Sequence, residues 1–252
     1  ALFDIEPSLE QVDFYLSRCL LANIKSVQLQ KLPPTDWVHE NRKEFPAFRI
    51  GGFWVHGSHI TNPAPAGLFP LCVDAAQAFG SGTHATTKGC LLAIQNASRS
   101  KRHIRRILDL GCGSGILSMA AKSLNPSAAV MAADYDQISV ETTRQNWQIN
   151  QYPKTAFFAL HSDGFSHERL RGKHKFDLIV ANILAKPLKQ FAPLIAQNLA
   201  SNGRVILSGL LTSQMRDIRA IYRHHHLFVM QHIQMDAWST LLLAPKTNYT
   251  KR

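Results

Sequence analysis

The chain has 252 residues, of which 45% are hydrophobic and 18% are charged. This length and composition suit one α/β core with a small appendage and argue against extensive disorder. The formal net charge of +11 favours anionic partners, so we expect a weak contact between the basic surface and nucleic acid. The apolar runs are too short to span a bilayer and no signal peptide is recognisable, which predicts a cytoplasmic protein without membrane contact.

The first residues predict a small N-terminal module. Residues 8–19 carry apolar side chains at helical spacing, with Ser8 as the expected N-cap, and residues 22–32 are typical of a short strand. Pro33-Pro34 ends this partial α+β module, which we place at residues 1–35. We interpret residues 36–70, rich in aromatic residues and then in proline, as a connector.

From residue 71 the pattern changes to alternating strands and helices, and we assign residues 71–252 to one domain. Alternation of this kind favours a doubly wound, mostly parallel α/β sheet. Only Asp236-Ala237 separates the last two strands, so they must form an antiparallel hairpin. Seven such strands have the architecture of methyltransferases that use S-adenosylmethionine (SAM). We predict strands at 105–110, 129–134, 156–161, 176–182, 204–208, 228–234 and 238–244, and helices at 86–98, 115–124, 137–150, 187–199 and 213–222.

The first strand of this domain runs into a glycine-rich turn, Gly-Cys-Gly-Ser-Gly at residues 111–115. Glycines allow a tight turn from strand to helix and let the backbone approach a ligand closely, which makes Gly111 and Gly113 candidate cofactor contacts. A dinucleotide site would have its third glycine at the position of Ile116. The loop therefore favours SAM, which has no pyrophosphate, over a nucleotide cofactor or a purely structural turn.

The second strand ends at Asp134, where a carboxylate can accept hydrogen bonds from both hydroxyls of a ribose. Asp109 precedes the glycine loop and has two open interpretations: it orients the loop, or it contacts the amine of the methionine part of SAM. The fourth strand ends at Asn182, beside the same crevice. Base-methylating enzymes usually carry Asn/Asp-Pro-Pro-aromatic there. This chain has Asn-Ile-Leu, which counts against base methylation.

Four segments together resemble the ribosomal protein L-eleven methyltransferase family (PrmA), and the resemblance covers most of the chain. It implies methylation of lysine ε-amines and of an N-terminal amine on a large-subunit ribosomal protein. It also implies SAM contacts at Thr87, Gly111, Asp134 and Asn182. The segments are Ala-Phe-Gly-Ser-Gly-Thr-His-Ala-Thr-Thr at 78–87, Leu-Asp-Leu-Gly-Cys-Gly-Ser-Gly-Ile-Leu at 108–117, Val-Ala-Asn-Ile-Leu-Ala-Lys-Pro-Leu at 180–188 and Leu-Ser-Gly-Leu-Leu at 207–211.

The chain departs from the family pattern at several positions. Ala85 stands where the family has proline, Ala75-Ala76 replace an upstream Pro-Gly, and Asn41 replaces a second connector tryptophan. The N-terminal recognition domain of the family is represented only in part, by residues 1–35. The partial N-terminal domain concerns the identity of the substrate and not the cofactor chemistry.

Methyl transfer to an amine is an in-line displacement that needs a neutral nucleophile. We hypothesise that the Asn182 side-chain carbonyl and the Ile183 backbone carbonyl accept the amine hydrogens and aim its lone pair, so that catalysis rests on orientation. The loop at 83–87 would close over SAM. His84 is a candidate base, although a structural role is favoured. The alternatives are an RNA or small-molecule methyltransferase and an inactive SAM-binding interaction module.

The cysteines and a run of histidines are not expected to take part in chemistry. The cysteines, Cys19, Cys72, Cys90 and Cys112, form no Cys-x-x-Cys pair, so we expect buried free thiols. Three consecutive histidines at 224–226 point in different directions on a helix, and we expect no metal site there.

Overall fold

The computed structural model describes residues 46–74, 82–99, 103–171 and 175–246. The helix predicted at 8–19, the strand predicted at 22–32 and the whole module at 1–35 lie outside these ranges. Cys19, Asn41, Ala75-Ala76 and the first four residues of the segment at 78–87 also lie outside them.

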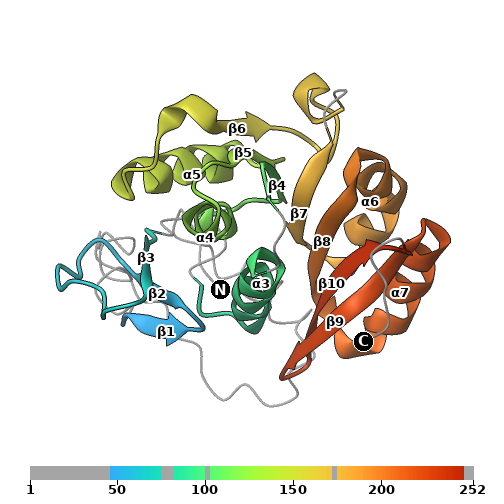
Figure 1. The fold of residues 1–252 in the computed structure, drawn as a ribbon, viewed down its shortest axis with the longest axis horizontal. Coiled ribbons are helices and arrows are strands. Elements are labelled where there is room, and N and C mark those ends of the chain that lie inside the picture. The colour runs from blue at the N-terminus through green and yellow to red at the C-terminus, as the bar shows by residue number, and fades with distance from the viewer. Residues whose placement is uncertain (1–45, 75–81, 100–102, 172–174, 247–252) are drawn as a thin grey trace, which may run out of the picture. The chain divides into compact units, whose positions relative to one another are not determined.

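The main sheet confirms the predicted fold class (Figure 1). Its strand order is β6-β5-β4-β7-β8-β10-β9, and β10 is antiparallel to both of its neighbours. The five strands from β6 to β8 are parallel to one another. The bounds are β4 (Arg106–Leu110), β5 (Ala129–Asp134), β6 (Phe157–His161), β7 (Phe176–Asn182), β8 (Leu199–Leu211), β9 (Leu227–Met235) and β10 (Trp238–Pro245).

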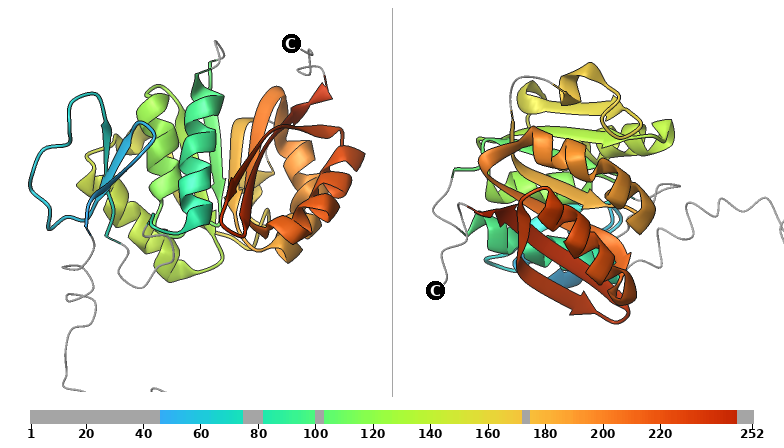
Figure 2. Two further views of the ribbon diagram at one scale, coloured as in Figure 1. Left: turned by 90° about the horizontal axis from the view of Figure 1, so that it is seen from below. Right: turned by 90° about the vertical axis from the view of Figure 1, so that its right-hand side faces the viewer.

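Helices cover the two faces of this sheet, as the three views together show (Figures 1 and 2). Alternate strand residues pack into two separate cores: Ile107 and Val180 face α3, α4 and α5, whereas Leu108 and Ile179 face α6 and α7. None of the helices in the described ranges is long and apolar enough to cross a bilayer. The bounds are α3 (Ala85–Ser98), α4 (Ile116–Leu124), α5 (Gln137–Ile149), α6 (Ala185–Asn198) and α7 (Met215–His224).

Three elements differ from their predicted bounds by two residues or more, and one of them, α7, spans Met215–His224 rather than 213–222. β8 extends well beyond 204–208, because it pairs with Phe176 at its start and with Trp238 at its end. α6 begins at Ala185 rather than at Pro187. Proline is tolerated near the start of a helix because the first four N–H groups have no partner within the helix, so its position there does not mark the first residue.

The segment interpreted as a connector forms a three-stranded sheet, made of β1 (Phe48–Ile50), β2 (Phe53–His56) and β3 (Phe69–Cys72), and β3 extends two residues past the predicted boundary at 70. None of these strands was predicted from the sequence. In β2, Phe53 and Val55 are buried while the two residues that follow them are half-buried. This alternation is the signal of a strand with one face in the core, and its short length concealed it.

Helix α5 holds this small sheet and the outer strand of the large one. Asn150 pairs with both backbone groups of Cys72: its Oδ1 accepts the N–H at 2.9 Å and its Nδ2 donates to the carbonyl oxygen at 2.7 Å. Asn146, one turn earlier, pairs in the same way with Asp74 at 3.0 and 3.2 Å. The two amides thus replace a neighbouring strand along the edge of β3.

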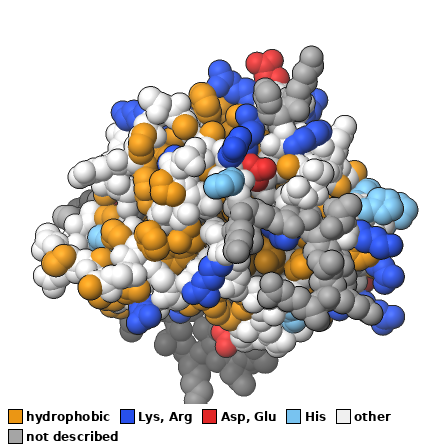
Figure 3. Space-filling view, in the orientation of Figure 1, with side chains coloured by type: hydrophobic (Ala, Val, Ile, Leu, Met, Phe, Trp, Pro, Cys, Tyr) orange, Lys and Arg blue, Asp and Glu red, His pale blue; other side chains and the backbone are white. Residues whose placement is uncertain are grey.

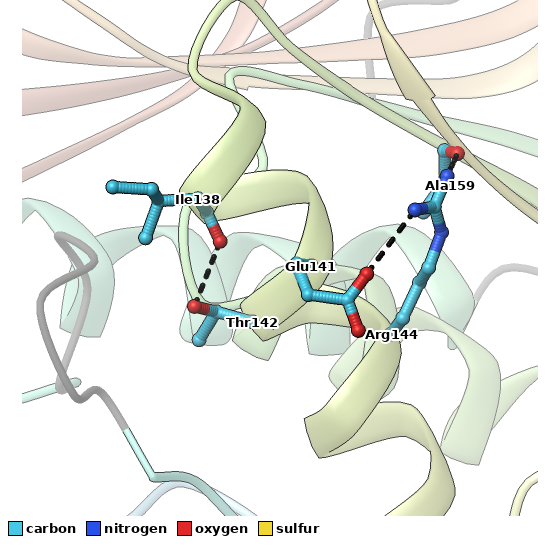
Figure 4. A network of polar contacts seen from close by, with 5 residues as sticks. All are labelled: Ile138, Glu141, Thr142, Arg144 and Ala159. Carbon is cyan, nitrogen blue, oxygen red and sulfur yellow. Dashed lines mark hydrogen bonds and ion pairs between the residues drawn. The ribbon is translucent and has the colours of Figure 1, made fainter.

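Arg144, also on α5, contacts the outer strand β6 of the main sheet (Figure 4). Its guanidinium donates to the Ala159 carbonyl oxygen at 2.7 Å and forms an ion pair with Glu141 at 3.3 Å. Ala159 lies on an edge strand, whose outward backbone groups have no neighbouring strand. Arg144 therefore satisfies an edge carbonyl and fixes α5 against β6.

We predict that Asn150→Ala lowers the free energy of unfolding by about 2–3 kcal/mol, because it leaves two backbone groups of Cys72 without their partners. Chemical denaturation measures this loss. The matched control is Gln148→Ala, on the exposed side of the same helix, which should change the free energy by less than about 0.5 kcal/mol. Equal effects of the two substitutions would show that the Asn150 contacts contribute nothing.

Candidate functional site

An open pocket of about 660 Å³ lies at the carboxyl ends of β4, β5, β6 and β7. This volume is within the range of sites for small molecules and cofactors. The sequence-predicted site residues all contribute to its lining, and their roles in binding stay a prediction. They are Thr87, Gly111, Gly113, Asp134, Asn182 and Ile183.

The glycine loop adopts the conformation for which its glycines were singled out. Gly111 has a φ of 75° and Gly113 a φ of 53°, in the left-handed region that L-residues rarely adopt. A Cβ on Gly111 would lie 2.3 Å from Cγ2 of Ile183, so a side chain there would collide with the end of β7. The loop is therefore fixed by its own backbone geometry and by close contact with the predicted catalytic segment.

Asp134 connects the ends of two strands. One carboxylate oxygen accepts the N–H of Gly113 at 2.9 Å, and the other accepts the N–H of Asp136 at 3.1 Å. A carboxylate has about four acceptor positions, so the two backbone bonds leave capacity for a ligand in the pocket. Asp134 thus braces the glycine loop in addition to the ribose contact that the sequence suggested.

Asp109 is buried and does not line the pocket. Its Oδ2 accepts both the backbone N–H of Ser118 at 2.9 Å and the Ser118 hydroxyl at 2.7 Å. Ser118 is the third residue of α4, and the N-cap Gly115 has no side chain to satisfy the free N–H groups there. Of the two interpretations left open for Asp109, the structure supports orientation of the loop and helix.

Burial raises the pKa of Asp109 from 3.8 to about 6, and the hydrogen bonds from Ser118 oppose this effect only in part. A folded-state pKa above the unfolded value means that the folded protein holds the proton more tightly. The stabilisation is therefore complete below the unfolded pKa and is lost as the pH rises through about 4 to 6.

We predict that Asp109→Asn removes this pH dependence. Between pH 4 and pH 7 the unfolding free energy of the variant should improve relative to the parent by about 2–3 kcal/mol, the scale of a shift of two pKa units. Urea denaturation of both proteins at several pH values measures this difference in unfolding free energy. The titration of all other groups is the same in the two proteins and cancels when one curve is subtracted from the other. Parallel curves for the two proteins would mean that Asp109 stays ionised in the fold.

The end of β7 places Asn182 and Ile183 at the pocket wall. The Asn182 side-chain nitrogen donates to the hydroxyl of Thr87 at 3.5 Å, which joins β7 to the first turn of α3. The backbone of Ile183 lies against Gly209 of β8: a Cβ on Gly209 would be 2.3 Å from the Ile183 carbonyl oxygen. Gly209 has a φ of 81°, so both its backbone conformation and its surroundings require glycine.

His84 has a structural role at this wall. It is the N-cap of α3 and accepts the N–H of Thr86 at 3.3 Å, while its ring meets Trp238 edge to face at a centroid distance of 5.0 Å. Because of this cap, α3 begins at Ala85. The segment at 83–87, which was expected to be a closing loop, is therefore helical from residue 85 onward, with Thr87 buried.

Several lining residues were not predicted from the sequence, including Ser162, Asp163, Phe191 and Trp238. Asp163 follows β6, and the rule that ligands bind at the carboxyl ends of parallel strands would have found it. Trp238 begins the antiparallel strand β10 and reaches the pocket only through the tertiary fold. Among the residues that line the pocket, three are aspartates (134, 136 and 163) and none is lysine or arginine.

The cysteines that the structure describes are buried free thiols. Burial raises the pKa of Cys72 to about 11, and the Cys90 and Cys112 pKa values also lie above the usual range for the same main reason. These thiols are therefore protonated at neutral pH and are poor nucleophiles. In the described ranges, no three His, Cys, Asp or Glu side chains are grouped so that they could hold a metal ion.

Comparison with solved structures shows the same fold. A crystal structure of a ribosomal protein L11 methylase from Lactobacillus delbrueckii subsp. bulgaricus superposes with a TM-score of 0.71 at 25% identity, covering 80% of this chain and all of that one. A Thermus thermophilus 16S rRNA N2 G1207 methyltransferase (RsmC), solved with AdoMet and guanosine, superposes with a TM-score of 0.53 at 22% identity. That match covers 67% of this chain and 45% of the other.

Sequence comparison is more specific. A protein named ribosomal protein L11 methyltransferase from Chelativorans sp. (strain BNC1) is 36% identical, covering 94% of this chain and 86% of its own. A protein of the same name from Bradyrhizobium diazoefficiens is 39% identical, covering 82% of this chain and 70% of its own. The family model described as ribosomal protein L11 methyltransferase (PrmA) matches residues 1–246. The chain belongs to this family of methyltransferases.

Proposed function

We propose that this methyltransferase transfers methyl groups from SAM to lysine ε-amines and the N-terminal amine of ribosomal protein L11, in the cytoplasm. The main support for the proposal is that Asn182, Ile183 and the glycine loop lie together in the lining of one acidic pocket. Family membership supports the substrate, since the relatives at 36 to 39% identity carry that name. We also include in the proposal a weak contact of the basic surface with nucleic acid.

The pocket residues fit SAM. The left-handed backbone of Gly111 and Gly113 turns the loop tightly along the pocket wall, and Asp134 has free acceptor positions for ribose hydroxyls. SAM carries a positive sulfonium, and three lining aspartates in a protein of net charge +11 suit a cationic ligand. When bound, SAM supplies an electrophilic methyl group, and the protein positions the amine acceptor next to it.

The amine acceptor must lose a proton before it can attack. A free lysine has a pKa of about 10.4, so the neutral form costs about 4–5 kcal/mol at pH 7. Burial next to a positive sulfonium lowers that pKa. The Asn182 and Ile183 carbonyl oxygens would then accept the two remaining hydrogens and direct the lone pair toward the methyl carbon.

The alternative substrates receive less support. Enzymes that methylate nucleic-acid bases usually carry an aromatic side chain directly after this asparagine, and the segment after Asn182 has none. A pocket with three carboxylates also repels phosphate. The RNA methyltransferase that superposes with this chain shares its fold at 22% identity, and a similar fold alone does not identify the substrate. An inactive binding module would transfer no label from SAM to any substrate, so a transfer assay distinguishes it.

We predict that Asn182→Ala lowers kcat for L11 by about 10²-fold, the effect of one lost hydrogen-bonding group at the reacting centre. Transfer of label from labelled SAM to L11 measures the rate, and Asn182→Asp should retain part of it because a carboxylate still accepts hydrogens. The rate is measured at saturating SAM, because Asn182 is also an expected SAM contact, and the melting temperature serves as the control and should change little.

The same assay separates the alternatives. With free RNA in place of L11, no label should be incorporated. Label in RNA but not in protein would overturn the proposed substrate, and a normal rate for Asn182→Ala would remove this residue from catalysis.

Gly209 tests the role of the Ile183 carbonyl. We predict that Gly209→Ala pushes that carbonyl away and lowers kcat by at least 10-fold with little change in SAM affinity. Gly67→Ala is a matched control: Gly67 has a φ of 79°, close to that of Gly209, but no atom lies within 4 Å of the added Cβ. Both variants carry the same backbone strain, so equal activities would exclude a positioning role for Gly209.

A further inference from the structure

The edge of the main sheet opposite the pocket has a distinct composition. The parallel strands begin there, β10 ends there with Pro245 beside Leu227 of β9, and the pocket occupies the other edge. Adjacent strands lie about 4.8 Å apart, so seven strands make an edge of roughly 29 Å. This edge contributes nothing to the proposed methyl transfer.

Basic side chains line this edge, and we name six of them the basic edge. Five lie beside the ends of five different strands, and Arg204 lies within β8, paired with Leu178 near the start of β7. Arg105 precedes β4, Lys154 lies just before β6, and Lys175 precedes β7. Most of the six are exposed, and Arg204 is half-buried. The complete set is Arg105, Lys154, Lys175, Arg204, Arg223 and Lys246.

Few acidic side chains lie beside the basic edge in the part of the chain that the structure describes. Asp177, at the start of β7, is the acidic residue beside the basic edge in the described part of the chain, and its carboxylate accepts the backbone N–H groups of Arg105 and Arg106. The two ion pairs between described residues, Glu141–Arg144 and Lys189–Asp217, lie elsewhere. Figure 3 shows Lys and Arg side chains spread over one face of the molecule, with few acidic ones.

We propose that the basic edge binds the phosphate backbone of RNA, on the side of the sheet opposite the catalytic pocket. A row of separate cations matches a polyanion with regularly spaced charges better than it matches a single small anion. None of these six residues lines the pocket. Because contacts to phosphate groups carry no information about the bases, this binding is independent of the RNA sequence. The choice of RNA over other polyanions rests on the proposed function, because a ribosomal protein is found with RNA.

Separation of the two edges has a functional consequence. RNA on the basic edge leaves the pocket open, so the enzyme can remain near ribosomal material while it methylates a protein. The acidic pocket repels the same phosphates. RNA binding and methyl transfer are therefore independent activities of one fold.

The test uses the full chain and a fluorescent RNA hairpin, with anisotropy read at several salt concentrations. The variant Lys154→Gln, Lys175→Gln, Arg223→Gln should weaken binding by at least 10-fold. It should also reduce the slope of log affinity against log salt by about two to three units, because each phosphate contact contributes about 0.9.

A control variant with the same change in net charge is Arg169→Gln, Lys186→Gln, Arg216→Gln, three exposed residues that follow the carboxyl ends of β6, β7 and β8, away from the basic edge. It should retain RNA affinity within about twofold. Equal weakening in both triple variants would overturn the proposal, because only net charge would then matter. Absence of RNA binding by the parent chain at low salt would also overturn it.

Competition identifies the partner. Anionic vesicles and polyglutamate should displace the hairpin poorly, and displacement as efficient as by unlabelled RNA would assign the edge to a membrane or an acidic protein instead. Methylation of L11 is measured on the same samples without RNA. A basic-edge variant that loses RNA and methylates normally supports the proposal, whereas a parent that binds RNA but methylates no protein contradicts only the proposed function.

Discussion

The hydrogen bonds of Asp134 fix the relative positions of three loops, and the pocket depends on them. Its carboxylate holds Gly113 of the first loop and Asp136 of the second, and its backbone carbonyl accepts the N–H of Ser162 at 2.8 Å from the third. The carboxyl ends of β4, β5 and β6 are therefore connected through one residue. A ligand that adds hydrogen bonds to this carboxylate meets an acceptor that is already oriented, and little ordering cost remains at binding.

Charge is distributed unevenly along the strands of this sheet. Aspartates gather at the carboxyl ends around the pocket, and lysines and arginines gather where the strands begin. The net charge of +11 consequently says little about the pocket, whose cationic ligands require the opposite sign. The average charge of a chain describes its surface and its partners, while the chemistry of a site depends on the few charges that face it.

The sequence predicted the large sheet well because its central strands are buried on both faces and its helices have clear periods. The six expected site residues line one pocket because five belong to strand ends or to the glycine turn, and Thr87 lies in the first turn of α3. Prediction failed where the signal is tertiary: the short strands β1 to β3 depend on the asparagines of α5, and Trp238 reaches the pocket through the antiparallel strand. Asp109 could not be assigned, since a carboxylate before a glycine loop serves either role until its partner, Ser118, is known.

Ile183 shows how a residue without a reactive side chain can be held in position for chemistry. Its side chain fills the space where Gly111 lacks a Cβ, and its carbonyl fills the corresponding space at Gly209. The two glycines belong to β8 and to the loop after β4, the strands on either side of β7. Any shift of one strand against its neighbours would therefore displace the carbonyl. Because orientation is the main catalytic contribution proposed here, the packing of three adjacent strands acts directly on the reacting geometry.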